Sequence, residues 1–491
     1  MVMLTTPKPA YVVLSFFVFL AVLISTHMLD FSIPIDEFIE RQQPAAVKPK
    51  PKSEIAESPN YPQVQKLEVP LNCTTAATKT CPRNYPTSFQ ADDPGLTCPD
   101  YFRWIHEDLR PWKATGITEE MIARASPTAA FRLTIVDGRV YIDQLRDWWE
   151  SRAAMNIWGI LQLLRRYPGK LPDLDLMFDC EDRPAILKKL QNATTPPPPL
   201  FTYCADDRTF DIVFPDWSYW GWPELNIKPW SILLKELEEG NKRIEWANRE
   251  PHAYWKGNPA VARTRRDLLK CNVSWFRDWN ARLYKQDWIK EIQQGFKESN
   301  IADKCTYKYN IYIEGNAWSV SGKYILACDS VTLIVTPHYY DFFTRGLIPL
   351  QHYWPIRESA KCKSIKFAVN WGESHKKEAQ EIGKSSTEFI MEDLKMEYVY
   401  DYMFHLLNEY AKLLKFKPAV PKNAVEYCSE TMACEAQEFK RKYMMDSLEK
   451  GPATRNPCAM PQPYDSEALF SMKKRRHDSI KKVEHKETSF W

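Results

Sequence analysis

The sequence predicts an α/β protein with two halves, and the first evidence is the alternation of its apolar segments. Short apolar runs typical of buried strands alternate with longer stretches whose apolar residues recur at helical spacing. The alternation continues for about 350 residues, which is typical of α/β folds. Hydrophobic residues make up 44% and aromatic residues 13% of the 491 residues, so the chain can bury a core and is not wholly disordered.

Local signals define the individual elements. Asp137-Gly138 is typical of a tight turn between two strands, and Pro168-Gly169 ends a helical pattern. In chain order, the predicted elements are a helix start at 119–125, strands at 131–135 and 139–142, a helix at 148–167, strands at 174–178, 212–214 and 311–313, a helix at 321–328, a strand at 332–335 and a helix at 399–414.

The first 97 residues predict a membrane anchor followed by a stem. Residues 11–29 carry no charge and are long enough to cross a bilayer as a helix. Lys8 before them and acidic residues after them indicate that residues 1–10 stay in the cytosol and the rest is lumenal. A cleaved signal peptide is the alternative, although its apolar core is usually shorter. Residues 30–97 are rich in proline and polar residues, which favours an extended stem.

All twelve cysteines follow the predicted anchor, and none belongs to a CxxC pair. This pattern argues against a zinc ribbon and favours disulfides formed in an oxidising lumen. Cys73 is close enough in sequence to pair with Cys81, as is Cys428 with Cys434, although sequence does not determine the connectivity. Three N-glycosylation sequons agree with lumenal exposure, and they begin at Asn72, Asn192 and Asn272.

The charge of the chain excludes a general nucleic-acid binder. There are 66 basic and 63 acidic residues, a net charge of +3, whereas a nucleic-acid-binding protein is usually far more basic. Much of that charge lies in 451–491, where seven lysines and arginines follow Ser471 against three acidic residues. We expect this segment to be a solvated, flexible end.

The missing motifs narrow the chemistry further. The chain has only 15 glycines and neither a Walker A motif nor GxGxxG, so phosphate binding must rest on basic and hydroxyl side chains. GxSxG and HExxH are absent too, which disfavours hydrolases and metalloproteases. Asp173 and Asp175 form a DxD, a motif that holds a divalent metal in many nucleotide-sugar transferases. Ordinary polarity before a strand explains them as well.

Asp182 is the first candidate for catalysis. It follows the predicted strand at 174–178, and catalytic groups in open α/β sheets gather at the carboxyl ends of strands. Asp179 and Glu181 share its turn, and neighbouring carboxylates raise a pKa toward the range of a general base. The alternative is a polar turn that caps the next helix.

The run FPDWSYWGW at 214–222 is unusually aromatic. Five aromatic residues in nine exceed what one strand can pack on one face. Aromatic faces beside acidic and hydroxyl groups suit a carbohydrate or peptide acceptor, so we expect acceptor contacts from Asp216, Trp217 and Trp220. A core cluster beneath a loop is the alternative.

Two later segments supply groups suited to a diphosphate. Lys256 and Asn258 lie in AYWKGNP at 253–259, and Arg265 follows. A predicted strand then leads into a glycine turn, hydroxyl groups and a helix start around residues 314–323, which together suit an anion. Arginine offers paired hydrogen bonds to phosphate and lysine a point charge, so a nucleotide diphosphate could bind without a metal. Solvated basic surface is the alternative.

Four segments in this order resemble glycosyltransferase family 90, the Rumi-type protein O-glucosyltransferases with a capsule-associated-protein domain. The resemblance covers roughly residues 95–445, and the residues of these segments are most similar to those of the plant branch. The segments are FDCEDRP at 178–184, FPDWSYWGW at 214–222, AYWKGNP at 253–259 with Arg265 and the DLL at 267–269, and YKYNIYIEGNAWSVSGKYILACDS at 307–330.

The resemblance implies a GT-B fold, in which two Rossmann-like halves face a cleft. It implies a first, acceptor-side half at 98–240 and a nucleotide-sugar half at 241–450 with a C-terminal crossover helix. The implied reaction is an inverting, metal-independent transfer of glucose or xylose from a UDP-sugar to a protein or glycan hydroxyl. Asp182 matches the family's catalytic base. The positions that match its donor-binding residues are Lys256, Asn258, Arg265, Ser319, Ser321 and Lys323.

The sequence also departs from the family. Animal members carry arginine at the position of Glu314 and near that of Pro259, which here removes positive charge beside the expected diphosphate. Animal members are soluble and end in a retention signal of the endoplasmic reticulum, whereas this chain has a predicted anchor. We therefore expect a single-pass type II protein of the Golgi or endoplasmic reticulum membrane.

Two other functions are compatible with the same residues. A non-catalytic lumenal protein could keep the fold and bind glycans through its aromatic run. A metal-dependent GT-A enzyme could use Asp173 and Asp175, and it would lose activity in EDTA.

Overall fold

The structure is a computed structural model that describes residues 67–491 except 77–79, 84–85, 89–90, 92–95, 148–149 and 192–194. The predicted cytosolic tail, the anchor at 11–29 and most of the stem lie outside the described residues. No helix in the described part of the chain has the length and apolar character that spanning a membrane requires.

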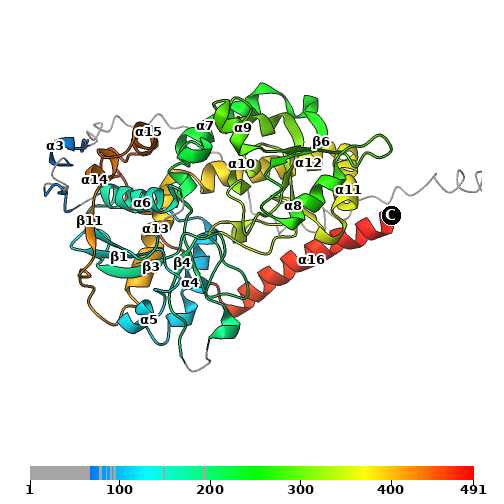
Figure 1. Ribbon diagram of the computed structural model, residues 1–491. Helices are drawn as coiled ribbons and strands as arrows, with labels where there is room; N and C mark the ends of the chain where they lie inside the picture. The colour runs from blue at the N-terminus through cyan, green and yellow to red at the C-terminus, as the bar shows by residue number, and fades with distance from the viewer. Residues whose placement is uncertain are drawn as a thin grey trace, which may run out of the picture. The chain divides into compact units, whose positions relative to one another are not determined.

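The α/β class is confirmed, because helices surround two separate sheets (Figure 1). The helices are α3 Cys73–Ala76, α4 Trp104–Asp108, α5 Glu119–Ala123, α6 Arg152–Arg166, α7 Trp230–Arg243, α8 Arg263–Leu268, α9 Trp288–Gln293, α10 Gly322–Leu326, α11 Lys361–Ser374, α12 Lys376–Glu388, α13 Met396–Ala411, α14 Ser429–Ala433, α15 Glu438–Asp446 and α16 Ser466–Phe490.

The first sheet has the strand order β11-β2-β1-β3-β4-β5. Its strands are β1 Phe131–Val136, β2 Arg139–Gln144, β3 Leu174–Phe178, β4 Phe201–Thr202, β5 Ile212–Val213 and β11 Val425–Tyr427. Strands β3, β4 and β5 run parallel, whereas β1 pairs antiparallel with both β2 and β3. This half is therefore mixed rather than fully Rossmann-like. The tight turn at Asp137-Gly138 is the reason, since a two-residue connection can join only antiparallel strands.

The second sheet is parallel throughout, with the order β10-β9-β8-β6-β7. Its strands are β6 Glu250–Gly257, β7 Ala281–Lys285, β8 Tyr307–Tyr312, β9 Val331–Val335 and β10 Trp354–Ile356. The chain starts at β6, adds β7 on one side and then returns to add β8 on the other. The place between β6 and β8, where the strand order reverses, is the switch point of the sheet. In such sheets ligands bind in the crevice beyond the carboxyl ends of the strands at the switch point. The topology therefore directs attention to the residues that follow β6 and β8.

The chain returns to the first half after the second sheet. Helix α13 packs against α6 and β3, and β11 joins the edge of the first sheet. The core of the first half is built on α6, whose Gly159 leaves room for Trp220. A Cβ at Gly159 would lie 2.3 Å from the indole, so this mid-helix glycine is required by close packing.

Three disulfides fasten the N-terminal segment to the C-terminal part of the fold. They join Cys73 to Cys434, Cys81 to Cys428 and Cys98 to Cys458. The pairs that proximity in sequence suggested, Cys73 with Cys81 and Cys428 with Cys434, do not form. The described residues of the predicted stem are thus attached to the globular part near residues 428–458.

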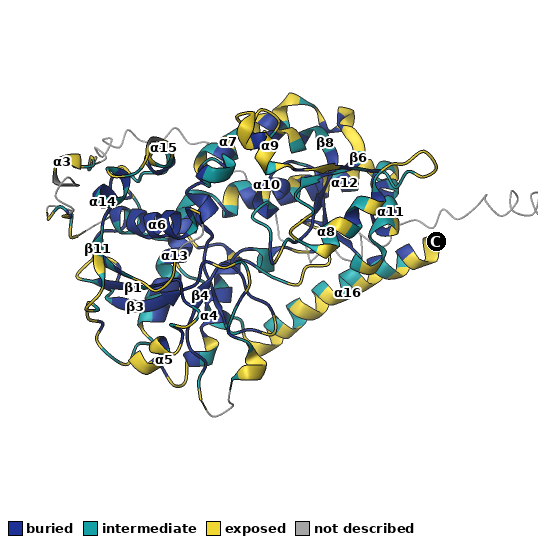
Figure 2. Cartoon of the chain, viewed as in Figure 1, coloured by how far each residue is buried: buried dark blue, intermediate teal, exposed yellow. Residues whose placement is uncertain are grey.

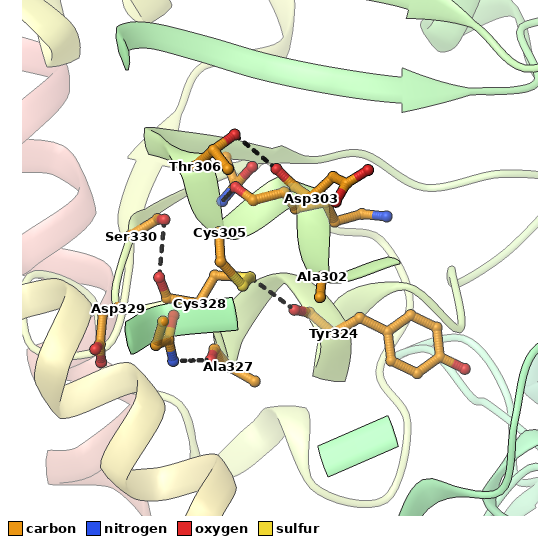
Figure 3. The surroundings of a disulfide bond; sticks show 12 residues. Ala302, Asp303, Cys305, Thr306, Tyr324, Ala327, Cys328, Asp329 and Ser330 are labelled. Atoms are coloured by element: carbon orange, nitrogen blue, oxygen red, sulfur yellow. Dashed lines mark hydrogen bonds between the residues drawn. A yellow bond between two sulfur atoms is a disulfide. The ribbon is translucent and has the colours of Figure 1, made fainter. Parts of the chain in front are cut away.

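A fourth disulfide joins Cys271 to Cys362, and a fifth joins Cys305 to Cys328. Figure 3 shows the fifth disulfide, in which Cys328 Sγ lies 3.5 Å from the Tyr324 backbone oxygen and the Cys328 backbone oxygen accepts a hydrogen bond from Ser330. The chain between these two cysteines contains β8, the turn after it and α10. The disulfide therefore joins the two ends of the segment that carries Ser319 and Ser321, whose hydroxyl groups are expected to bind the donor.

The C-terminal residues form a helix, so the prediction of a flexible end is wrong. Asp465 caps α16 by accepting a hydrogen bond from the Ala468 amide, at 2.7 Å. Near its other end Glu487 is 1% exposed and accepts hydrogen bonds from Arg357 at 2.6 Å and Ser364 at 2.8 Å. Figure 2 shows that much of the helix remains exposed. Five of its basic residues are exposed: Lys473, Lys474, Arg475, Lys481 and Lys482.

Candidate active site

Asp182 lies in the turn that follows β3 and is held from both halves of the fold. Its Oδ1 accepts a hydrogen bond from Arg152 Nη1 at 2.7 Å, and Arg152 begins α6. Its Oδ2 accepts a hydrogen bond from Asn316 Nδ2 at 3.3 Å, and Asn316 lies in the turn after β8. The side chain keeps 33% of its surface exposed. A carboxylate that is oriented but still reachable is what a general base needs.

The turn buries a different carboxylate, that of Asp179. It accepts a hydrogen bond from Arg146 at 2.6 Å and another from the Glu181 amide at 3.3 Å. Burial raises the pKa of Asp179 to about 6, although Arg146 opposes that shift. The Asp179 side chain is 4% exposed, so it supports the turn from the interior of the fold.

Asp211, which precedes β5, supports the same turn by accepting hydrogen bonds from the amides of Ala185 and Ile186 at 2.8 and 2.9 Å. Burial raises the pKa of Asp211 from 3.8 to about 7. Between these pH values the folded state keeps a proton that the unfolded state has lost, so stability falls as pH rises from about 4 to 7. We expect Asp211→Asn to reduce, by about 2–4 kcal/mol, the difference between the free energies of unfolding at pH 4.5 and pH 7, measured by urea titration. If the variant shows the same difference as the wild type, Asp211 is not the group that keeps the proton.

Arg265 ties together the turns that follow β6 and β8. Its guanidinium donates hydrogen bonds to the backbone oxygens of Glu314 at 2.9 Å, Ile313 at 3.1 Å and Asn258 at 3.3 Å, and to Ser319 Oγ at 3.2 Å. Burial lowers the pKa of Arg265, with nearby Tyr312 and Asp182 opposing that shift. Arg265 thus places a cation at the switch point of the second sheet, near Asp182.

The hydroxyl groups of Ser319 and Ser321 lie beside this cation. They hydrogen-bond each other at 2.9 Å, and the Ser319 amide donates to the Tyr312 hydroxyl at 3.1 Å. Arg265 thus links the Asn258 backbone to Ser319 and Ser321, and Asn316 links the same segment after β8 to Asp182.

The two halves meet at this point. Arg183 Nε, from the first half, donates a hydrogen bond to the Asn316 backbone oxygen at 3.1 Å. Together with the Asn316–Asp182 contact, this links the turn after β3 to the turn after β8.

The structure places the two expected donor lysines elsewhere. Lys256 Nζ donates a hydrogen bond to the Glu298 backbone oxygen at 2.5 Å and lies 3.6 Å from Glu291, on the α9 side. Lys323 is 2% exposed and hydrogen-bonds Asp216 at 3.4 Å and Ser218 at 2.8 Å inside the fold. Lys323 thus makes an internal ion pair instead of lying at a diphosphate site on the surface.

The expected acceptor residues are also buried. Asp216, Trp217 and Trp220 are 5%, 1% and 0% exposed. Trp220 lies on Gly159 and donates to the Tyr400 hydroxyl at 3.1 Å. The core alternative thus explains most of the aromatic run, whose polar and aromatic members pack inward.

The DxD does not form a metal site in this arrangement. Asp175 is fully buried in β3 and pairs with Arg132, while Asp173 accepts a hydrogen bond from the Asp137 amide at 2.9 Å. Glu314 accepts hydrogen bonds from the amides of His338 and Tyr339 at 2.9 and 2.8 Å. Glu314 is 6% exposed, so it is a buried acceptor for the backbone at residues 338–339.

Sequence reasoning missed Arg152 and Asn316. Arg152 is separated from Asp182 by a helix and a strand, and no spacing rule links them. Asn316 lies inside the quoted segment at 307–330 but has no charge to mark it. Both residues become visible only when the two turns are brought together.

Comparison with known proteins identifies the family of the chain. The family model described as Glycosyl transferase family 90 matches residues 93–487. The chain is 26% identical to "O-glucosyltransferase rumi" of Drosophila pseudoobscura pseudoobscura over 347 residues, which cover 68% of this chain and 81% of the relative. It is 24% identical to "Protein O-glucosyltransferase 1" of Bos taurus over 334 residues, which cover 65% and 81%. The parallel second sheet, the carboxylate beside its switch point and the family match together show that the chain belongs to glycosyl transferase family 90.

Proposed function

We propose that this protein is an inverting glycosyltransferase that moves glucose or xylose from a UDP-sugar to a hydroxyl of a protein serine or a glycan. The observation that carries the proposal is the contact of Asp182 with Asn316, which lies in the segment after β8 that also contacts Arg265 through Glu314 and Ser319. The two separate sheets, one mixed and one parallel throughout, support a GT-B-like arrangement. The relatives' names support protein as the acceptor class.

In the proposed reaction Asp182 takes the proton of the acceptor hydroxyl. The acceptor oxygen forms a bond to the anomeric carbon as the bond from that carbon to the diphosphate breaks, and its electron pair leaves with UDP. Arg265, Ser319 and Ser321 would bind the donor phosphates, with Arg265 supplying the charge. Attack from the face opposite UDP inverts the anomeric centre.

We propose that the reaction needs no metal and that residues 11–29 anchor the protein in the Golgi or endoplasmic reticulum membrane with the fold in the lumen. The five disulfides support an oxidising compartment. The inward packing of the aromatic run weighs against the alternative of a non-catalytic glycan-binding protein.

The test is a screen of UDP-sugars with product mass as the readout, using the full chain in detergent and serine-containing peptides or glycans as acceptors. We expect transfer of a hexose or a pentose that EDTA leaves unchanged. Glycan binding with no transfer from any UDP-sugar would support the non-catalytic alternative. Loss of transfer in EDTA would contradict the proposed metal independence.

Arg265→Lys should weaken use of the donor. Lysine cannot reach the three backbone oxygens and Ser319 at once, so the turns after β6 and β8 lose their common contact. We expect kcat/KM for the donor to fall about 10–100-fold, the range for hydrogen bonds to a charged group. The neighbouring Arg266→Lys is the control, because Arg266 contacts only the exposed Ala260 oxygen among the hydrogen bonds described. Equal losses in both variants would contradict the role of Arg265.

A further inference from the structure

We propose that Arg152 is the positioning residue of the site, which orients the Asp182 carboxylate, and that the aromatic run holds Arg152 in turn. The inference rests on the proposed role of Asp182 as general base. Arg152 Nη1 donates to Asp182 Oδ1 at 2.7 Å, and the Arg152 side chain is only 17% exposed. A hydrogen bond between a guanidinium and a carboxylate is short and directional, so this contact can fix where the carboxylate points.

Two tryptophans of the aromatic run form a clamp on Arg152. The guanidinium carbon lies 4.5 Å from the centre of the Trp217 ring and 5.4 Å from that of Trp222. The two rings meet edge to face, with centroids 4.8 Å apart at 78°. A planar guanidinium stacks on indole faces while its edge N–H groups remain available for a carboxylate.

Glu150 completes the clamp from the other side. It accepts a hydrogen bond from Trp222 Nε1 at 2.9 Å and lies 3.6 Å from Arg152 Nε. Arg152 is therefore held by two rings and a carboxylate, so its Nη1 has a defined direction. This gives Trp217, which is 1% exposed, a role in the site without contact to the acceptor.

The other charged and titratable groups near Asp182 are committed elsewhere. From the first half, Arg183 donates to the Asn316 oxygen, and Cys204 after β4 donates its thiol proton to the Asp182 backbone oxygen at 3.2 Å. Asp179, in the same turn, pairs with Arg146, and Glu181 is its neighbour. From the second half, Arg265 donates to backbone oxygens and Ser319, and Asn316 is neutral.

Among the described residues, Arg152 is thus the cation in direct contact with the Asp182 carboxylate. The other oxygen of that carboxylate has only the longer contact with Asn316, 3.3 Å. An acceptor hydroxyl can replace that contact while Arg152 keeps the carboxylate in place.

The test compares kcat and the donor KM of the full chain and its variants. We expect Arg152→Gln to lower kcat about 10–100-fold, because the carboxylate loses its hydrogen bond to a charged group, and Arg152→Lys, which can keep one such bond, to lower kcat less. The donor KM should change less than about threefold, since Arg152 makes no described contact with the expected donor residues. Trp222→Leu leaves Arg152 intact but removes one ring, and it should lower kcat by a smaller factor.

Arg146→Gln is the matched control, because it removes an arginine from Asp179 in the same turn. The inference is overturned if Arg152→Gln keeps the kcat of the wild type, or if Arg146→Gln lowers kcat equally. The free energy of unfolding from urea titration is measured for each variant as the check on folding. A wild-type protein that transfers no sugar contradicts the proposed function, while an unchanged kcat in Arg152→Gln contradicts the role of Arg152.

Discussion

Asp182→Asn is expected to lower the transfer rate by about 10²–10⁴-fold, the range for loss of a general base. Asparagine has nearly the shape of aspartate, and its oxygen can still accept the hydrogen bond from Arg152, so the turn should keep its geometry. Its amide cannot take a proton from the acceptor. The measurement is the initial rate of sugar transfer at saturating donor, with the free energy of unfolding from urea titration as the check on folding.

Asp179→Asn is the matched control for that experiment. Asp179 lies three residues earlier, is almost fully buried and pairs with Arg146. We expect its replacement to alter stability while the rate stays within about tenfold of the wild type. The assignment of the base fails if Asp182→Asn keeps more than a tenth of the wild-type rate, or if the two variants lose equal activity.

Lys323→Met should be the most destabilising of these replacements, because it leaves Asp216 buried without its cation. Burial alone would lower the pKa of Lys323, yet Asp216 raises it above the usual value, so the lysine is charged inside the fold. Its Nζ also donates to Ser218 at 2.8 Å and lies 4.4 Å from the centre of the Tyr219 ring. Breaking a buried pair from one side costs about 3–5 kcal/mol, which we expect in the free energy of unfolding by urea at pH 7.

The double variant Lys323→Met/Asp216→Leu separates this explanation from simple loss of packing. Removing both charges leaves neither partner uncompensated, so most of the lost stability should return. Because Asp216 follows β5 and Lys323 lies in α10, the pair joins the two halves beneath the site. A double variant as unstable as Lys323→Met alone would show that the ion pair is not the cause.

The sequence predicted the elements that depend on local chemistry. The Asp137-Gly138 turn, the apolar strand at 174–178 and the helix that ends before Pro168 lie within a few residues of where they were expected. Turn residues and apolar periodicity act over a few neighbouring residues, so a single chain reveals them. The sequence predicted part of the site for the same reason, because Asp182 follows a buried strand.

The sequence predicted long-range pairing poorly. The disulfides of the N-terminal segment join cysteines 347 to 361 residues apart, and proximity in sequence suggested other partners. Glu487 shows the same effect at the C-terminus, since its burial by Arg357 and Ser364 turns an expected loose end into a packed helix.

By itself, the sequence determined the α/β class, the order of the family segments and Asp182 as the candidate base. Only the tertiary structure decided that Lys323 and the aromatic run belong to the interior and that Arg152 and Asn316 contact the Asp182 carboxylate. The physical reason is that a side chain's charge or aromaticity states what it can pair with, whereas its partner and its burial depend on which distant segments the fold brings beside it.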